Sequence, residues 1–141
     1  MKQLLLILLV AFASCTSRQR AEQREHKTDN ENTVATVPLN NGAKWKADEA
    51  TKKNVAAMVQ IITDSAYADA AKRKELYTNL KAKIDTLVKE CSMKGARHDA
   101  LHVWLEKVLN DLKELEKSDN EYSETYTALK KDVENFYESF E

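Results

Sequence analysis

The feature of this sequence that most restricts its fold is an apolar stripe in the middle of the chain. Five apolar side chains recur there at steps of four, four, three and four residues, which places them on one face of a helix. They are Leu76, Leu80, Ile84, Leu87 and Cys91. The stripe predicts a helix over residues 69–93, which must bury this face against other elements.

Three further stretches repeat the same spacing. Residues 45–63 carry the stripe Val55, Met58, Val59 and Ile62. Residues 97–117 have Trp104 on one flank and carry the stripe Leu101, Leu105, Val108, Leu112 and Leu115. A capping-box pattern of Ser118 and Glu121 opens the last stretch, whose stripe is Tyr122, Tyr126, Leu129, Val133, Phe136 or Tyr137, and Phe140. The chain therefore predicts four amphipathic helices.

Short connections between these helices determine the expected fold class. The sequence is poor in glycine and proline, and no alternating β-branched run supports a strand. Short connections make consecutive helices antiparallel neighbours. We therefore expect an all-α fold, an up-down-up-down antiparallel four-helix bundle over residues 42–141.

The amino-terminal residues predict export and lipidation. Lys2 precedes an apolar run over residues 4–12, which is too short to span a bilayer, since spanning takes about 20 residues. The F-A-S-C sequence ending at Cys15 resembles a bacterial lipoprotein signal, which implies that residues 1–14 are removed and that Cys15 carries lipid. By the same resemblance, Thr16 implies sorting to the outer membrane. Plain secretion, with Cys15 left as a thiol, is the alternative.

The residues that follow are polar and predict a flexible tether over residues 15–41. Almost no large apolar side chains occur there, so the segment cannot bury enough surface to offset its ordering entropy. Across the whole chain the formal net charge is −1, and basic and acidic residues are interleaved. This pattern argues against a nucleic-acid partner, which would require a clustered basic excess.

The chemically richest stretch lies between the second and third predicted helices, around Gly95. We interpret Gly95 as the end of the second helix, so that two helices deliver their side chains to one corner. His98 and His102 stand four residues apart, which puts both imidazoles on one helical face within reach of a single ion. Thiolate and imidazole ligands suit zinc or copper, and the Met93 thioether favours Cu(I). The candidate metal ligands are Cys91, Met93, His98 and His102.

Other interpretations of this corner remain open. Cys91 and Met93 can be ordinary apolar residues at the end of a core stripe, with both histidines at a helix seam. Haem attachment is disfavoured because a C-x-x-C-H pattern is absent. Hydrolysis through Cys91 would need an oxyanion hole, for which no glycine-rich segment provides a basis. We expect neither an enzyme nor a nucleotide cofactor.

The corner also resembles a known group of proteins. Its C-S-M-K-G and H-D-A-L-H-V-W-L sequences, with L-N-N-G-A-K-W-K over residues 39–46, resemble small periplasmic lipoproteins of Bacteroidota. In that group the first sequence is commonly C-T-M-K-G, and Ser92 stands here in place of the threonine. The resemblance covers most of the chain from residue 39 onward. It implies an envelope location and a helical fold, and it adds weight to a metal site.

These features together predict a binding module anchored in the bacterial cell envelope, on the outer membrane and facing the periplasm. The expected ligand is one zinc or copper ion at the corner between the second and third helices. The rival hypothesis is a helical envelope protein without metal, which acts as a protein-protein interaction or structural module. The expected partners are the membrane, through lipid on Cys15, and an envelope protein.

Overall fold

The computed structural model describes residues 36–141, and this part of the chain is helical. Apart from two isolated β-bridges, it contains no strand. Its elements are α1 (Glu49–Thr63), the 3₁₀ turns η1 (Ser65–Ala68) and η2 (Ala70–Lys72), α2 (Arg73–Glu90), α3 (Ala96–Lys117), α4 (Tyr122–Glu134) and the short α5 (Phe136–Ser139). The predicted signal peptide, the predicted lipidation site Cys15 and the tether up to residue 35 lie outside the described residues.

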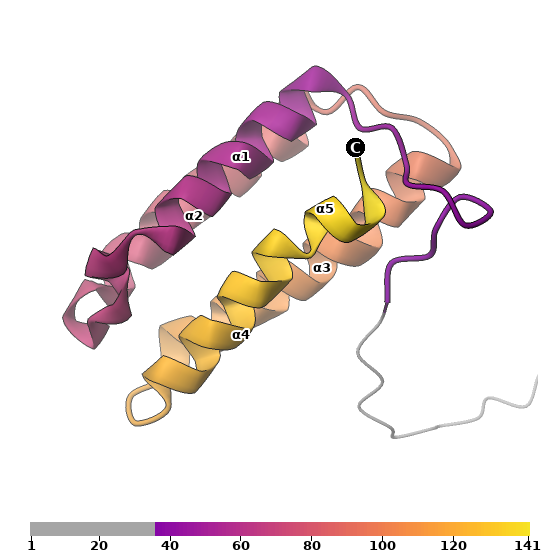
Figure 1. Ribbon diagram of the computed structural model, residues 1–141. Coiled ribbons are helices and arrows are strands. Elements are labelled where there is room, and N and C mark those ends of the chain that lie inside the picture. Colours follow the sequence, from indigo (N-terminus) through magenta and orange to yellow (C-terminus); the bar gives the residue numbers. More distant parts are fainter. Residues whose placement is uncertain (1–35) are drawn as a thin grey trace, which may run out of the picture. The chain divides into compact units, whose positions relative to one another are not determined.

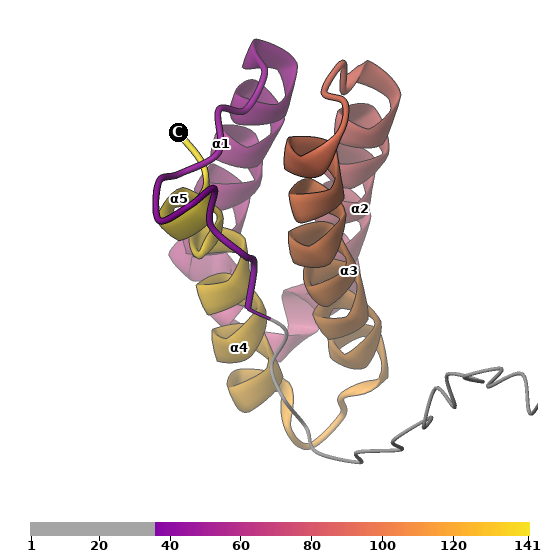
Figure 2. The ribbon, with the colours of Figure 1, turned by 90° about the vertical axis from the view of Figure 1, so that its right-hand side faces the viewer.

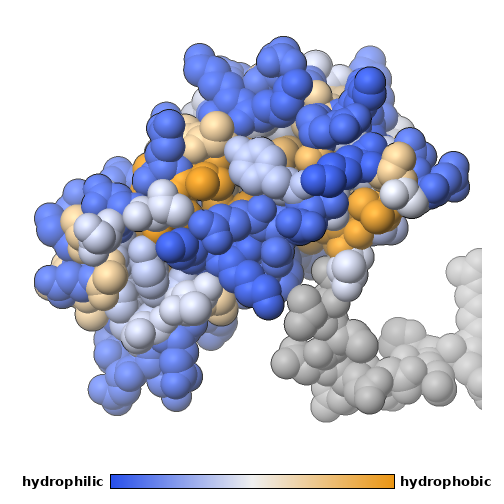
Figure 3. Space-filling view, viewed as in Figure 1, coloured by the Kyte–Doolittle hydropathy of each residue, from blue (hydrophilic) through white to orange (hydrophobic). Residues whose placement is uncertain are grey.

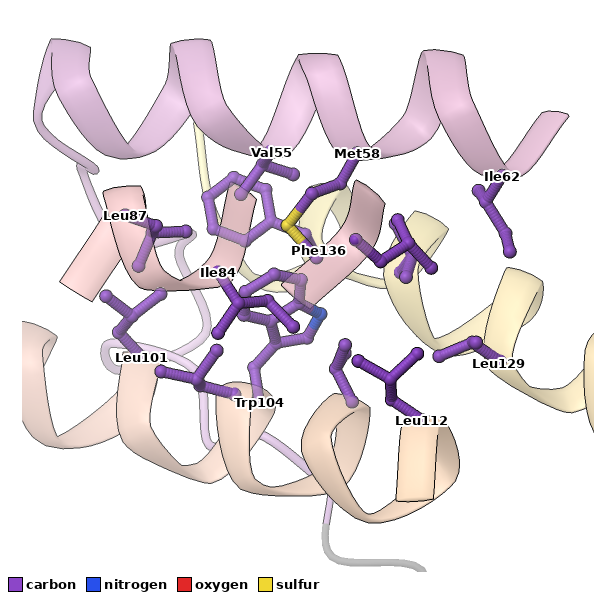
Figure 4. Packing of buried hydrophobic residues seen from close by; sticks show 14 of the residues in the cluster. Val55, Met58, Ile62, Ile84, Leu87, Leu101, Trp104, Leu112, Leu129 and Phe136 are labelled. Atoms are coloured by element: carbon purple, nitrogen blue, oxygen red, sulfur yellow. The ribbon is translucent and has the colours of Figure 1, made fainter. Parts of the chain in front are cut away.

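Four long helices pack against one another, which confirms the all-helical class predicted from the stripes. Helix α1 packs against α2 and α4, and α3 packs against α4 and α2 (Figures 1 and 2). Figure 4 shows apolar side chains of these helices pointing toward a common interior. The most completely buried side chains of the described residues include Met58, Ile62, Leu76, Leu80, Ile84, Leu87, Leu101, Leu112, Leu115, Leu129, Phe136 and Phe140. The face seen in Figure 3 is mostly hydrophilic, as expected when the stripes point inward.

No helix in the described range combines the length and the apolar character that crossing a bilayer requires.

Helix α1 begins later than the sequence predicts, at Glu49 rather than near Trp45. The Asp48 side chain caps the helix by accepting a hydrogen bond from the Thr51 N–H at 2.8 Å. Trp45 and Ala47 lie outside the helix and pair with the end of the chain. The Trp45 N–H donates to the Ser139 carbonyl at 2.8 Å, and the Glu141 N–H donates to the Trp45 carbonyl at 2.9 Å.

The predicted end of the second helix is also wrong. Helix α2 ends at Glu90, and Gly95 is the N-cap of α3 rather than a C-cap of α2. The chain leaves the helix early because Asp48 Oδ2 accepts hydrogen bonds from the Ser92 N–H at 2.6 Å and the Ser92 hydroxyl at 2.8 Å. Gly95 has φ 64°, a conformation that glycine adopts without steric cost.

Two details of the third and fourth helices differ from the sequence prediction. The Ser118 hydroxyl donates back to the Leu115 carbonyl at 2.9 Å, so it does not cap α4, which begins at Tyr122. Trp104 is buried rather than on a flank, because its indole N–H donates to the Asp132 carbonyl of α4 at 2.8 Å. Its ring packs on Phe136 with 5.1 Å between centroids.

Candidate functional site at the corner between α2 and α3

The corner is built around a chain segment that two helices hold in place. Cys91 is the C-cap of α2, and its N–H donates to the Leu87 carbonyl at 2.9 Å. The next residue, Ser92, is fixed by Asp48 at the start of α1. Partial burial opposes ionisation of Asp48, but the hydrogen bonds from Thr51 and Ser92 outweigh it and lower the pKa of this carboxyl. Asp48 therefore holds α1 and the corner together as an anion.

Cys91, His98 and His102 lie in a line with His98 in the middle. Cys91 Sγ is 3.7 Å from Nδ1 of His98. On the other side of the same ring, Nε2 of His98 is 2.9 Å from Nε2 of His102. The two imidazoles meet edge to face, at 4.5 Å between centroids and 78° between planes. The thiol and the second imidazole thus contact opposite nitrogens of His98.

The short distance between the two Nε2 atoms restricts how the protons are arranged. Two N–H groups cannot point at each other, so at least one of these nitrogens offers a lone pair. If His98 carries its proton on Nδ1, facing the Cys91 sulfur, its Nε2 is the free acceptor. His102 then either donates a proton across the 2.9 Å gap or offers a second lone pair. In the second state the two lone pairs repel each other, and a cation bound by both nitrogens would relieve that repulsion.

The distance between the two Nε2 atoms, 2.9 Å, is slightly shorter than the distance between two ligands of one transition metal ion. Zinc binds imidazole nitrogen at about 2.0–2.1 Å, and two ligands of a tetrahedral ion stand about 3.4 Å apart. The rings would therefore separate by about half an ångström. His102 is exposed and His98 is partly exposed, so an ion can reach them from solvent.

The other two predicted ligands are placed differently. Cys91 is partly buried and lies on the far side of the His98 ring from His102. Met93 is 4 % exposed and belongs to the hydrophobic core. Within residues 36–141, no three His, Cys, Asp or Glu side chains are arranged to hold one ion together. The structure brings three of the four predicted residues into contact, in a row rather than around one point.

A second polar cluster, which the sequence interpretation missed, lies between α3 and α4. Lys107 Nζ is 2.5 Å from Asp132 Oδ2, and 3.6 Å from Asp111 Oδ2. Burial, a hydrogen bond with the Asp132 carboxylate and repulsion from it raise the pKa of Asp111 to about 7. Burial also opposes the charge of Asp132, but hydrogen bonds with Asp111 and Lys107 lower its pKa. The spacing of Lys107 and Asp111 by four residues could have indicated this ion pair from the sequence. The participation of Asp132 could not have been predicted, because it lies on another helix.

Comparison with protein-family models, with curated proteins and with solved structures finds no significant match to this chain.

Proposed function

We propose that this protein is a lipid-anchored binding module of the bacterial envelope, facing the periplasm, which takes up one zinc or copper ion at the corner between α2 and α3. The observation that supports the ion is the pair of Nε2 atoms of His98 and His102, 2.9 Å apart on an exposed face. We further propose that the helices form an up-down-up-down antiparallel bundle, in which the corner lies beside the segment that leads toward Cys15.

In this proposal His98 and His102 bind the ion, and Cys91 orients His98. Metal-bound histidines usually donate their second ring N–H to a neighbouring acceptor, which fixes the tautomer and the ring orientation. The Cys91 sulfur, 3.7 Å from Nδ1, is placed to accept that proton. Direct ligation by Cys91, with Met93 as a weaker ligand, is the alternative arrangement predicted from the sequence.

Nitrogen NMR of the histidine side chains tests which atoms bind. On addition of Zn(II) to the full chain, the Nε2 resonances of His98 and His102 should shift, while Nδ1 of His98 stays protonated. Cys91→Ala should weaken binding by about 10–100-fold, the usual cost of removing an orienting partner. Loss of the Nδ1 proton on zinc addition would instead support direct ligation through the Cys91 side of the ring.

A protein-protein interaction module without metal is the second candidate. A hollow of about 300 Å³ runs along the outer face of α3 from His102 to Lys113, and Leu105 and Leu109 contribute apolar surface to it. In that case one histidine donates a hydrogen bond to the other. The hollow then contacts an envelope protein. Unchanged imidazole resonances at millimolar Zn(II) and Cu(I) would favour this candidate over the metal site.

The anchor is tested separately, because it concerns residues that the structure does not describe. Wild-type protein should fractionate with membranes and carry an acyl mass on Cys15, since several acyl chains hold a protein firmly. Cys15→Ala should remain unprocessed and lose the lipid. A mature wild-type amino terminus without acyl mass would reject the anchor and leave the metal proposal standing.

A further inference from the structure

A basic hollow lies beside the start of α3, and none of the candidate metal ligands lines it. Its volume is about 480 Å³, and its lining includes four cationic side chains and one carboxylate. The cations come from two separate segments of the chain, and the carboxylate is Glu141. The four are Lys44, Lys46, Lys94 and Arg97. Figure 1 shows the segment before α1 running past the start of α3, which is how the two sets meet.

None of the four cations has an anionic partner among the described residues. Lys44 donates to the Tyr137 carbonyl, which fixes that side chain. Lys46, Lys94 and Arg97, in contrast, form neither an ion pair nor a side-chain hydrogen bond with any residue of the described part. Asp48 remains an anion, but it does not line the hollow. The hollow therefore keeps an unbalanced positive charge.

The start of α3 adds backbone donors to the same place. Ala96 and Arg97 line the hollow and are the first two residues of this helix of 22 residues. The first N–H groups of a helix have no acceptor within it, and they concentrate the positive end of its dipole. No side chain caps them here, because Gly95 occupies the N-cap position. A Cβ at Gly95 would meet no atom within 4 Å, so this N-cap residue leaves space beside the start of the helix.

We propose that this hollow binds a phosphate group, from free phosphate or from the headgroup of an anionic phospholipid. Uncapped helix donors together with Lys and Arg side chains are the combination that recognises phosphate oxygens. Trp45 lines the same hollow. Its indole N–H donates to the Pro38 carbonyl at 2.6 Å, which holds the ring beside the cations. A tryptophan among basic residues is typical of surfaces that meet lipid headgroups.

Amide NMR of the full chain in nonionic detergent micelles tests the site. Either inorganic phosphate, phosphatidylglycerol or phosphatidylcholine is added, and the amide signals of Lys94, Gly95, Ala96 and Arg97 are followed. We expect saturable shifts with phosphatidylglycerol, with phosphate, or with both, reversed by high salt because screening weakens the charge contacts. Shifts with phosphatidylglycerol alone assign the headgroup as the ligand, and shifts with phosphate assign the bare phosphate group.

Charge-matched variants separate the site from the overall charge. Lys46→Gln with Arg97→Gln should weaken binding about tenfold or more, because each basic group near an anionic surface contributes roughly one factor of five. Lys53→Gln with Lys89→Gln removes the same charge from exposed positions on α1 and α2 and should change binding less than about twofold. Equal losses in both double variants, equal shifts with phosphatidylcholine, or no shifts with any additive would overturn the proposal.

Discussion

Helix α3 carries two polar clusters, and they differ in whether a cation of the protein lies among their polar atoms. At its start, His98 and His102 face outward, and their nitrogens meet each other and the Cys91 sulfur. Further along, Lys107 and Asp111 face α4, where Asp132 neutralises the lysine at 2.5 Å. The second cluster is closed, because a cation of the protein already occupies its centre. Among the described residues no cation of the protein pairs with the two histidines, so the proposed metal ion is assigned to them and not to the second cluster.

The largest expected effect on stability comes from removing the lysine that lies between Asp111 and Asp132. Lys107→Met leaves Asp132, whose side chain is 8 % exposed, as a buried charge without its cation. We expect the free energy of unfolding to fall by about 2–4 kcal/mol, somewhat less than for a fully buried pair because Lys107 is partly exposed. Urea denaturation measures this. Lys113→Met, on the exposed face of the same helix, is the control and should change stability by less than about 0.5 kcal/mol. Similar losses in the two variants would show that Lys107 does not stabilise the buried carboxylate of Asp132.

A smaller change in the free energy of unfolding is expected when the pH is varied. The pKa of Asp111 lies at about 7 in the folded protein, against an ordinary aspartate value of 3.8, so between these values the folded state holds a proton that the unfolded state has released. The free energy of unfolding should therefore fall as pH rises from about 4 to 7. Allowing for solvent screening at this partly exposed side chain, the change should be about 1–2 kcal/mol.

Asp111→Asn tests the origin of that slope. The variant lacks the titrating carboxyl, so its stability measured in urea at pH 4.5–7.5 should vary less than that of the wild type. Asp132 does not contribute in this window, because its pKa is lowered and its stabilisation is lost only as pH falls below its unfolded value. A variant with the wild-type slope would place the responsible proton elsewhere.

The smallest effect is expected at the histidine pair when metal is absent. His102→Ala removes an exposed side chain whose hydrogen bond to His98 can be replaced by water. In the presence of a chelator its unfolding free energy should lie within about 0.5 kcal/mol of the wild type. Thermal or urea denaturation measures this. A loss of about 2 kcal/mol or more would mean that the pair is a structural seam, as in the alternative interpretation of the sequence.

The sequence was sufficient to predict what depends on periodicity. The stripe residues Leu76, Leu80, Ile84 and Leu87 are buried, and so are Val55, Met58 and Ile62, because helical spacing decides which side chains share a face. The contact between His98 and His102 follows from the same rule. Their side chains lie four residues apart on one helix, so no knowledge of the tertiary structure was needed to pair them.

The predictions from the sequence that were wrong concern contacts between residues far apart in the chain. Asp48 reaches Ser92 across 44 positions and so ends α2 before Cys91, which local propensity cannot reveal. Trp104 is buried because it finds an acceptor on α4. The order of Cys91, His98 and His102 along a line depends on where α2 releases the chain. Spacing alone therefore suggested a shared ion but could not tell which nitrogen each neighbour would contact.

The measurement that tests the central claim most directly is native mass spectrometry of the full chain, purified without chelator and titrated with Zn(II) and Cu(I). The wild type should bind one ion per chain. His98→Ala and His102→Ala should each bind at least about 100-fold more weakly, because each removes one of two protein ligands. Glu106→Gln, one turn beyond His102 on α3, should bind as the wild type does. No ion on the wild type, or equal binding by the wild type and both histidine variants, would contradict the account.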